Sequence, residues 1–341
     1  MDDMTDAVEA DRVRSAGPES AGAASRPTTM RAILTLTVNP ALDVSTSVDR
    51  VTSDQKLRCG PTRLDPGGGG VNVARVVQRL GGQALAVYAA GGPTGEAYRR
   101  LIDAERVPSV VVPISGSTRE SFTVDETSTG KQYRFVLQGP ELSEVEWRTC
   151  LAHTAASIPM GGYVVASGSL PPGVPDDFYA RVARLARERD ARCLVDASGP
   201  ALAAALAEGV FMVKPSRREL GEHVGATLDS DESQVDAASA LVAEGSAEFV
   251  ALSLGAAGAV LASKAGIIRL PVPRVKVRST VGAGDSFLGA FVLRLAQGHD
   301  AQAAFRAAVA AGSATAMTPA TELCHRDDVE RLEAELAALA G

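Results

Sequence analysis

The stretch that decides the fold is STVGAGDS, residues 279–286, which leads directly into the apolar run FLGAFVLRL of residues 287–295. The apolar run predicts a buried helix, and the glycine-rich turn before it would present several backbone N–H groups at the helix N-terminus. These N–H groups and the helix dipole together favour a bound anion. We therefore predict that residues 282–284 form an anion hole and that Asp285 is a catalytic base beside a phosphate undergoing transfer. The alternative is a simple glycine-rich loop in which Asp285 caps the helix.

A second glycine-rich turn also precedes a predicted helix. Residues 66–75 read PGGGGVNVAR, and apolar residues recur at helical spacing from Val71 onward. Successive glycines are costly to order, and they are justified where another molecule must approach the backbone closely. This stretch is neither a G-x-G-x-x-G fingerprint nor a Walker loop, because no Gly-Lys-Ser/Thr follows. Asn72 falls in the first turn of the helix, from which its amide could reach a sugar hydroxyl.

Composition limits the classes of function. The chain has 341 residues, of which 45% are apolar, so it can bury a sizeable core. Its net charge of −7, without a basic block, argues against nucleic-acid binding. No apolar run reaches the roughly 18 residues that a membrane span requires. The four cysteines are scattered without a C-x-x-C pair, which is typical of reduced thiols in a cytoplasmic protein rather than of disulfides or a zinc site.

The chain divides into a tail and one α/β domain. Residues 1–30 are acidic and polar, with neither periodicity nor the apolar core of a signal peptide, so we expect a disordered N-terminal tail. Residues 31–341 begin with a strand and show strand–helix repetition from residue 143 onward, which predicts a three-layer α/β sheet with site loops along one edge. The main predicted strands are residues 33–38, 84–89, 110–114, 163–167, 192–195, 210–213 and 249–253.

Weaker alternation in two further segments predicts a small separate β-sheet. These segments are residues 43–64 and 118–138, the second of which contains the turn sequence Ser128-Thr129-Gly130. Half-exposed strands outside the main layers suit a lid over a site, and their apolar face suits a dimer contact. We therefore expect a β-lid and a homodimer formed through it.

The two glycine-rich helix starts, in this order and at this separation, resemble those of the PfkB (ribokinase-like) family of carbohydrate kinases. The resemblance extends from Ile33 to the C-terminus, and the stretches SGSLPPG (167–173) and VKP (213–215) strengthen it. It implies a ribokinase-like three-layer α/β/α sandwich with a small β-sheet lid as one kinase domain over residues 31–341. Within the family, Ser279 stands where many members carry Asp, which favours the branch that acts on phosphosugars.

The resemblance implies ATP-dependent phosphorylation of D-fructose 6-phosphate to D-fructose 1,6-bisphosphate, a glycolytic reaction, with Mg²⁺ neutralising the phosphates. Asp285 would take the proton of the sugar's primary hydroxyl while Gly282, Ala283 and Gly284 stabilise the transferred phosphoryl group. The alternative substrates are tagatose 6-phosphate and fructose 1-phosphate. An alternative from another class is a regulator that binds sugar phosphate without turnover.

The remaining site residues are carried over from the family's motif positions. The residues expected on the substrate's sugar are Asp43, Gly68, Gly69 and Asn72. The basic residues expected in the lid strands, for the substrate's phosphate, are Lys56, Arg58 and Arg119. Ser169 is expected to be a further substrate contact. The residues expected on ATP are Lys214, Ser216, Ser253, Gly255, Gly258, Thr280 and Ser313.

Two departures from the family pattern concern metals. The family's Asn-x-x-Glu motif is replaced by Ser216-Arg217-Arg218-Glu219, which keeps the carboxylate expected to position Mg²⁺ through water but shortens the first side chain. We therefore expect an active enzyme with altered handling of Mg²⁺ or ATP. In related enzymes, Ser279 and Val281 with residues 318–322 help to form a K⁺ site. Pro319 and Glu322 depart from that pattern, although backbone carbonyls could still bind the ion, so the sequence leaves K⁺ binding open.

Overall fold

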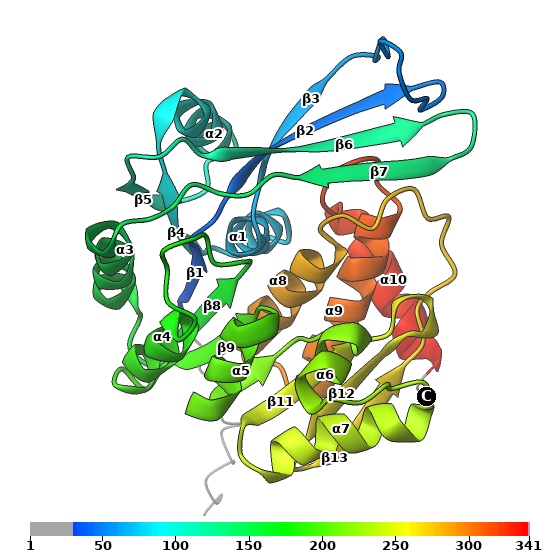
Figure 1. Cartoon of the computed structure of the whole chain (residues 1–341). Helices are drawn as coiled ribbons and strands as arrows, with labels where there is room; N and C mark the ends of the chain where they lie inside the picture. Colours follow the sequence, from blue (N-terminus) through cyan, green and yellow to red (C-terminus); the bar gives the residue numbers. More distant parts are fainter. Residues whose placement is uncertain (1–29, 340–341) are drawn as a thin grey trace, which may run out of the picture.

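The computed structural model describes residues 30–339, so the tail expected over residues 1–30 lies outside the described residues, apart from Met30. Within residues 30–339, nine strands form one sheet in the order β13-β12-β11-β10-β9-β8-β1-β4-β5 (Figure 1). The strand β12 is antiparallel to both of its neighbours, and all other neighbouring strands are parallel. The strands are β1 (Ile33–Thr37), β4 (Leu85–Ala90), β5 (Ser109–Pro113), β8 (Tyr163–Ser167), β9 (Arg192–Asp196), β10 (Val210–Val213), β11 (Ala247–Ser253), β12 (Ala259–Ser263) and β13 (Gly266–Leu270).

Helices cover both faces of this sheet, which gives the expected three-layer sandwich (Figure 1). Side chains alternate along each strand, so Ile33 of β1 joins one hydrophobic core while Leu34 and Leu36 join the other. One core contains side chains from α1 (Gly69–Arg79), α2 (Gly92–Ala104), α8 (Ala283–Ala296), α9 (Ala301–Ala316) and α10 (Arg326–Leu339). The other contains α3 (Glu144–Ser157), α4 (Phe178–Arg187), α5 (Gly199–Glu208), α6 (Arg217–Val224) and α7 (Asp231–Ala243). No helix in the described part of the chain is both long and apolar enough to cross a membrane.

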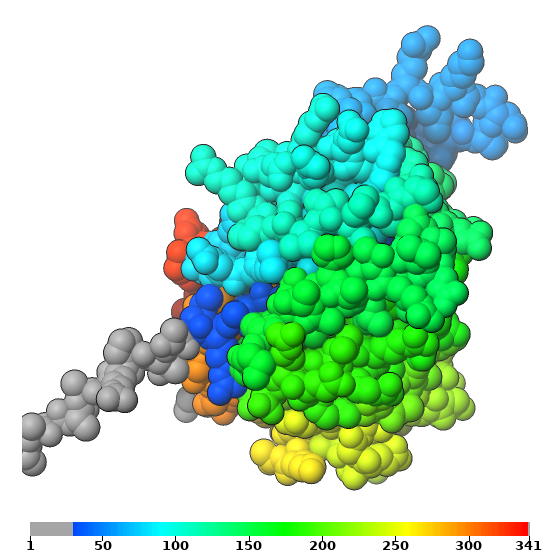
Figure 2. All heavy atoms as spheres, turned by 90° about the vertical axis from the view of Figure 1, so that its left-hand side faces the viewer, coloured from blue at the N-terminus to red at the C-terminus, as the bar shows by residue number. Residues whose placement is uncertain are grey.

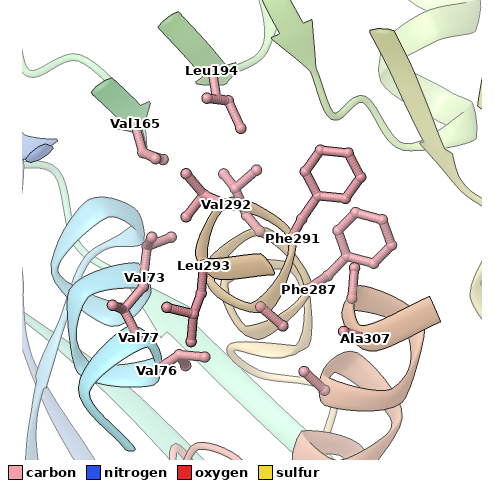
Figure 3. Packing of buried hydrophobic residues seen from close by; sticks show 14 of the residues in the cluster. Val73, Val76, Val77, Val165, Leu194, Phe287, Phe291, Val292, Leu293 and Ala307 are labelled. Carbon is pink, nitrogen blue, oxygen red and sulfur yellow. The ribbon is translucent and has the colours of Figure 1, made fainter. Parts of the chain in front are cut away.

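The helix α8 is the centre of the first core. It lies between α1 and α9, with the valines of α1 directed toward Leu293 and with Phe287 and Phe291 on its other side (Figure 3). A Cβ atom on Gly289 would stand 2.8 Å from Val76 Cγ1, so glycine at this position allows α1 and α8 to approach closely. This packing brings the two glycine-rich helix starts together.

The predicted small sheet is present. Its strands are β2 (Ala41–Val48), β3 (Arg63–Gly67), β6 (Arg119–Glu126) and β7 (Lys131–Val136), paired in the order β3-β2-β6-β7. The sheet lies above the carboxyl-terminal edge of the main sheet (Figure 1) and, in side view, residues near 50–65 project beyond the body (Figure 2). Its inner face contacts the body where Ser45 Oγ lies 3.2 Å from Thr321 Oγ1 and where the Arg63 guanidinium lies 2.7 Å from the Glu322 carboxylate.

One detail of the lid differs from expectation. Lys56 and Arg58 were expected in lid strands, but residues 49–62 form no strand and both side chains are exposed. The segment contains the turn formers Thr52, Ser53 and Asp54 and the Gly60-Pro61 pair, and Asp54 takes a positive φ of 59°. Such residues interrupt strand pairing, because proline lacks an N–H group and a positive φ breaks the extended backbone.

The starts of two helices add to what the sequence indicated. Asp285 does not cap its helix, because the N-cap is Gly282 and Asp285 is the third residue of α8. Residues 217–224 form the short helix α6, which was not among the helices predicted from the sequence. Ser216 begins α6 through a reciprocal capping box with Glu219, a local signal that favours a helix start even in a polar segment.

Candidate active site

The site lies where the strand order of the main sheet changes direction. From β1 the sheet continues through β4 and β5 on one side and through β8, β9 and β10 on the other. The crevice at the carboxyl ends of strands at such a switch point is the usual ligand site of open α/β sheets. The N-terminus of α1 enters this crevice so closely that a Cβ atom on Gly69 would stand 2.1 Å from the Ser167 hydroxyl at the end of β8.

The predicted anion hole is the N-terminus of α8. Gly282 adopts a left-handed conformation with a φ of 76°, which glycine tolerates without strain, and turns the chain into the helix. The first-turn N–H groups, which include those of Ala283 and Gly284, have no partners inside the helix, and the Ala283 N–H donates a long 3.4 Å hydrogen bond to the Thr280 carbonyl. Lys214 adds a positive charge here, because a Cβ atom on Gly284 would stand only 3.1 Å from the Lys214 Nζ. Backbone dipoles and an ammonium group thus converge on one point.

Asp285 projects from the first turn of α8 next to this point. Its Oδ2 accepts a 2.9 Å hydrogen bond from the Asn72 amide nitrogen, so the two helix starts are joined by their polar side chains. Burial, and after it the nearby Asp196, raise the pKa of Asp285 to about 6, although Asn72, Lys214 and Arg134 act in the opposite direction. A carboxylate with a pKa near neutrality is suited to accept a proton from a hydroxyl group.

Asp43 lies on β2, directly opposite Asp65 in the pairing with β3. Burial raises the pKa of Asp43 to about 7, against the lowering effect of Arg134 and Arg119. The turn before α1 packs directly against it, because a Cβ atom on Gly67 would stand 2.1 Å from Asp43 Oδ2. Gly68 follows with a φ of 118°, a conformation that favours glycine. The structure therefore brings Asp43, Asn72 and the glycine turn together, as expected for a polyol site.

Arg119 and Ser169 lie together at the outer end of this region. Arg119 donates through Nη2 to the Asn39 carbonyl at 3.1 Å, and the Asn39 amide nitrogen donates to Ser169 Oγ at 3.2 Å. Both line an open hollow of about 550 Å³ beneath residues 136–139. Among the described residues, the buried Nε of Arg119 has no hydrogen-bond partner. An unpaired guanidinium nitrogen beside a hydroxyl is suited to a phosphate group. Lys56 and Arg58 are not brought to this point.

Sequence reasoning missed Arg134 and Asp196. Arg134 of β7 pairs with Thr123, which pairs with Ser45 of β2, so all three share the inner face of the lid. Its charge lowers the pKa of both Asp43 and Asp285. The period-2 alternation of residues 132–137 could have indicated which residues share a strand face with Arg134. The pairing of the strands is needed to show that this face covers the site.

Asp196 ends β9 and lies 3.2 Å from the Lys214 Nζ. Burial favours neutral Lys214, but Asp196 and Asp285 outweigh it and raise the pKa of Lys214 above its ordinary value. Lys214 therefore remains a cation in a buried position. The sequence placed Asp196 at the carboxyl end of a strand, where site residues are common. That position alone does not show that Asp196 pairs with Lys214.

The other residues expected on the nucleotide occupy adjoining loops. The Ser253 N–H donates to the Pro215 carbonyl at 3.1 Å, and Gly255 and Gly258 bound the short turn that follows, both with positive φ. Thr280 is exposed immediately before the turn into α8. Ser313 is buried, and its hydroxyl donates to the Val309 carbonyl of its own helix at 2.7 Å.

The donors available to a metal ion are few. Among residues 30–339, no group of three or more His, Cys, Asp or Glu side chains is arranged to hold one. Glu219 Oε2 accepts the Ser216 N–H at 2.8 Å, which leaves its other carboxylate oxygen available. This set fits a hard cation bound mainly through phosphate oxygens and water, as Mg²⁺ is.

The region expected to bind K⁺ is tightly hydrogen bonded. The Ser279 hydroxyl donates to the Ala320 carbonyl at 2.6 Å and accepts the Val281 N–H at 3.2 Å. The carboxylate of Glu322 is engaged by Arg63 and lies 2.8 Å from His325 Nε2. Glu322 is therefore tied to the lid, and in this part of residues 30–339 backbone and hydroxyl oxygens are available to a monovalent cation.

Comparison with known proteins identifies the class to which this fold and site belong. The family model of pfkB family carbohydrate kinases matches residues 38–327, and the chain belongs to this family. The expected family and its three-layer fold with a small sheet are thus confirmed. The sequence is 47% identical to ATP-dependent 6-phosphofructokinase isozyme 2 of Mycobacterium tuberculosis over 306 residues, 90% of each chain. It is 41% identical to the Escherichia coli protein of that name, over 89% of this chain and 99% of the other.

Solved structures of phosphofructokinase-2 from E. coli have the same fold. The complex with potassium has a TM-score of 0.87 at 41% identity, covering 90% of this chain and 100% of that one. The complex with fructose-6-phosphate and a tetrameric inhibited form each have a TM-score of 0.86 at 40% identity over the same shares of the two chains.

Proposed function

We propose that this protein transfers the γ-phosphoryl group of ATP to D-fructose 6-phosphate and forms D-fructose 1,6-bisphosphate. The observation that carries the proposal is the Asp285 carboxylate beside the N-terminus of α8 and the Lys214 ammonium, a base next to an anion site. Two relatives at 47% and 41% identity bear the name of this activity, over about nine tenths of the chain. The nearby Arg119 and Ser169 give the substrate's own phosphate a binding place.

Each step follows from the side chains present. Asp43 and the glycine turn hold the sugar hydroxyls, and Asp285 accepts the proton of the primary hydroxyl as its oxygen attacks the γ-phosphate. The N–H groups at residues 282–284 and the Lys214 ammonium stabilise the charge on the transferred group. The lid brings Arg134 over both carboxylates and restricts water around them.

The family membership implies ATP as the co-substrate together with a divalent metal ion. We assign the metal as Mg²⁺, which would neutralise charge on the nucleotide phosphates. Glu219 would contact its water shell through the carboxylate oxygen that α6 leaves free, and Ser216 supports that carboxylate through its backbone N–H. A K⁺ ion bound near Ser279, Val281 and Ala320 is our second metal assignment. Replacing K⁺ by Na⁺ in the assay should lower kcat if the ion is bound there.

We further propose that the protein is a cytoplasmic homodimer formed through the lid. The outer face of the lid carries Leu64 and Phe135, which are 46% and 53% exposed and would be covered by a second copy. The strand order places β3 and β7 at the sheet edges, next to this apolar face. Phosphofructokinase-2 from E. coli has a tetrameric inhibited form, so assemblies larger than a dimer occur in that relative. Four free cysteines are consistent with a reducing compartment.

The experiment that tests the proposed function compares substrates at one ATP concentration. We expect kcat/KM for fructose 6-phosphate to exceed the values for tagatose 6-phosphate and fructose 1-phosphate by at least about tenfold. A higher value for either alternative would change the substrate assignment within the same mechanism. Tight binding of a hexose phosphate without ADP release would instead identify a regulator and would overturn the proposal.

A further inference from the structure

Arg75 is a buried cation to which the mechanism above gives no task. It lies on α1, and only 1% of its side chain is exposed. Burying an arginine is costly unless its N–H groups are paired and hydrogen bonded. An apolar side chain could fill the same volume without this cost. The contacts of the Arg75 guanidinium therefore indicate why an arginine is present.

Its contacts extend from α2 to the active site. Nε and Nη2 donate to the two carboxylate oxygens of Glu105, at 2.8 and 2.5 Å, in a bidentate pair at the end of α2. Nη1 donates to the Pro66 carbonyl at 2.9 Å and to Asn72 Oδ1 at 3.0 Å. The guanidinium is therefore fixed on one side by Glu105, and on the other it holds the amide oxygen of Asn72.

This contact determines which end of the Asn72 amide faces Asp285. An amide has a donor end and an acceptor end, and the two can exchange by rotation about one bond. Arg75 has only N–H donors, so it binds the oxygen and directs the nitrogen toward the Asp285 carboxylate. If the amide turned around, its oxygen would face the carboxylate and repel it.

We propose that Arg75 is a positioning residue for the reaction, which acts through Asn72 to hold the Asp285 carboxylate in place and in its ionised form. The proposal rests on the role of Asp285 as the base in the proposed function. It requires that the hydrogen bonds from Glu105 through Arg75 and Asn72 to Asp285 affect the reaction. A role for Arg75 in fold stability alone would not be enough.

Other charged groups also affect the ionisation of Asp285. The effect of Arg75 has to be distinguished from theirs. Asp196 from β9 disfavours ionisation, whereas Lys214 after β10 and Arg134 of the lid favour it. None of these three groups is hydrogen bonded to Arg75.

Arg75 also lies 3.7 Å from the Asp65 carboxylate, and its charge lowers the pKa of Asp43. A variant that keeps this positive charge therefore mainly changes the hydrogen bonds that connect Arg75 to Asn72 and Glu105.

The test is a double-mutant cycle with the pH dependence of kcat as the readout. Arg75→Lys keeps the charge but loses the planar fork, so it cannot hold Glu105 and Asn72 together. We expect the acidic limb of the profile to move to higher pH by about half a unit to one unit, with kcat at pH 6 falling about twofold to fivefold. In the Asn72→Ala background, Arg75→Lys should cause no further movement of this limb, because the connecting amide is gone.

The controls separate positioning from folding. Arg294→Lys changes a similar ion pair, Arg294 with Glu333 at 2.7 Å on α8 and α10, and should leave the acidic limb in place. Glu105→Gln releases Arg75 from outside the site, so it provides the same test with a smaller expected movement should Arg75→Lys fail to fold. An unmoved limb in a folded variant, or an equal movement with and without Asn72, would overturn the proposal.

Carbon-13 NMR titration of the Asp285 carboxyl provides the same readout without substrate. An inactive wild-type enzyme would count against the proposed function, whereas an Asp285 titration that Arg75→Lys does not move would count against the role of Arg75. The two failures are therefore distinguishable.

Discussion

The amide nitrogen of Asn72 donates a 2.9 Å hydrogen bond to Oδ2 of Asp285, which joins two helix starts that are 213 residues apart in the sequence. This bond connects the turn that suits a sugar with the turn that suits a transferred phosphate. It also lowers the pKa of Asp285, although burial still keeps that pKa at about 6, above the ordinary value for aspartate. The site therefore contains a carboxylate that ionises at a cost to the fold, and this has consequences for stability and for catalysis.

The stability of the protein should depend on the ionisation of Asp285. Because the folded pKa is raised, the folded state binds more protons than the unfolded state, and this contribution to stability is lost as pH rises from about 4 to about 6. Asp285→Asn cannot ionise, so we expect its free energy of unfolding above pH 6 to exceed the wild-type value by about 1–2 kcal/mol. Chemical denaturation at pH 4 and pH 8 measures the difference. The exposed Asp49→Asn is the control, and equal stabilities at pH 8 would contradict the assignment.

Arg134 should be needed for full activity although it matches no motif. Arg134→Met removes a charge that lowers the pKa of Asp43 and Asp285, so both carboxyls become harder to ionise. We expect kcat/KM to fall about tenfold at pH 6 and less at pH 8. Lys131→Met is the matched control, because Lys131 lies on the same strand opposite Glu126, on the outer face. A pH-independent loss in Arg134→Met would point to lid folding instead.

Ser216 should set how the enzyme uses its divalent metal. Ser216→Asn lengthens the side chain that caps α6 and disturbs the capping box that holds Glu219. We expect the half-saturating Mg²⁺ concentration or the KM for ATP to change by about threefold or more, with turnover retained. Ser230→Asn alters the same kind of capping box at the start of α7 and should change neither quantity. If Ser216→Asn behaves as the wild type in a Mg²⁺ titration, Ser216 does not alter how the enzyme uses the metal, and the prediction is contradicted.

The outer face of the lid should be a subunit contact. Phe135→Glu places a charge at an exposed aromatic position of β7, where a second copy would bury it. Sedimentation should then show a shift from dimer toward monomer at micromolar concentration. Val145→Glu, on the exposed side of α3, is a control in which a more exposed apolar residue lies away from the lid. A wild-type protein that sediments as a monomer would contradict the proposed dimer.

Local sequence patterns were sufficient for most of the main sheet. The buried strands Tyr163–Ser167 and Val210–Val213 match the prediction residue for residue, because uninterrupted apolar runs bounded by polar loops admit few other interpretations. The helix α6 was missed because it is short and polar, and its evidence is a cap rather than a periodic face. A capping box is a local sequence pattern, so it can be recognised from the sequence alone.

The parts that could not be predicted depend on contacts between distant residues. The role of Arg134 depends on the register of β2, β6 and β7, which is set by pairing across some ninety positions of sequence. The pairing of Asp196 with Lys214 and the path from Glu105 through Arg75 likewise require the packed fold. Lys56 and Arg58 show the reverse case, because weak alternation and the match to the family's motif positions suggested a strand, and turn-forming neighbours prevented it.

The most direct test of the account is the turnover of Asp285→Asn with ATP and fructose 6-phosphate, measured together with binding of both ligands. We expect kcat to fall by about 10²–10⁴-fold, because the general base is removed, while the dissociation constants change less than about threefold. A variant that binds both ligands normally and keeps more than about a tenth of the wild-type kcat would contradict the assignment of Asp285 as the base.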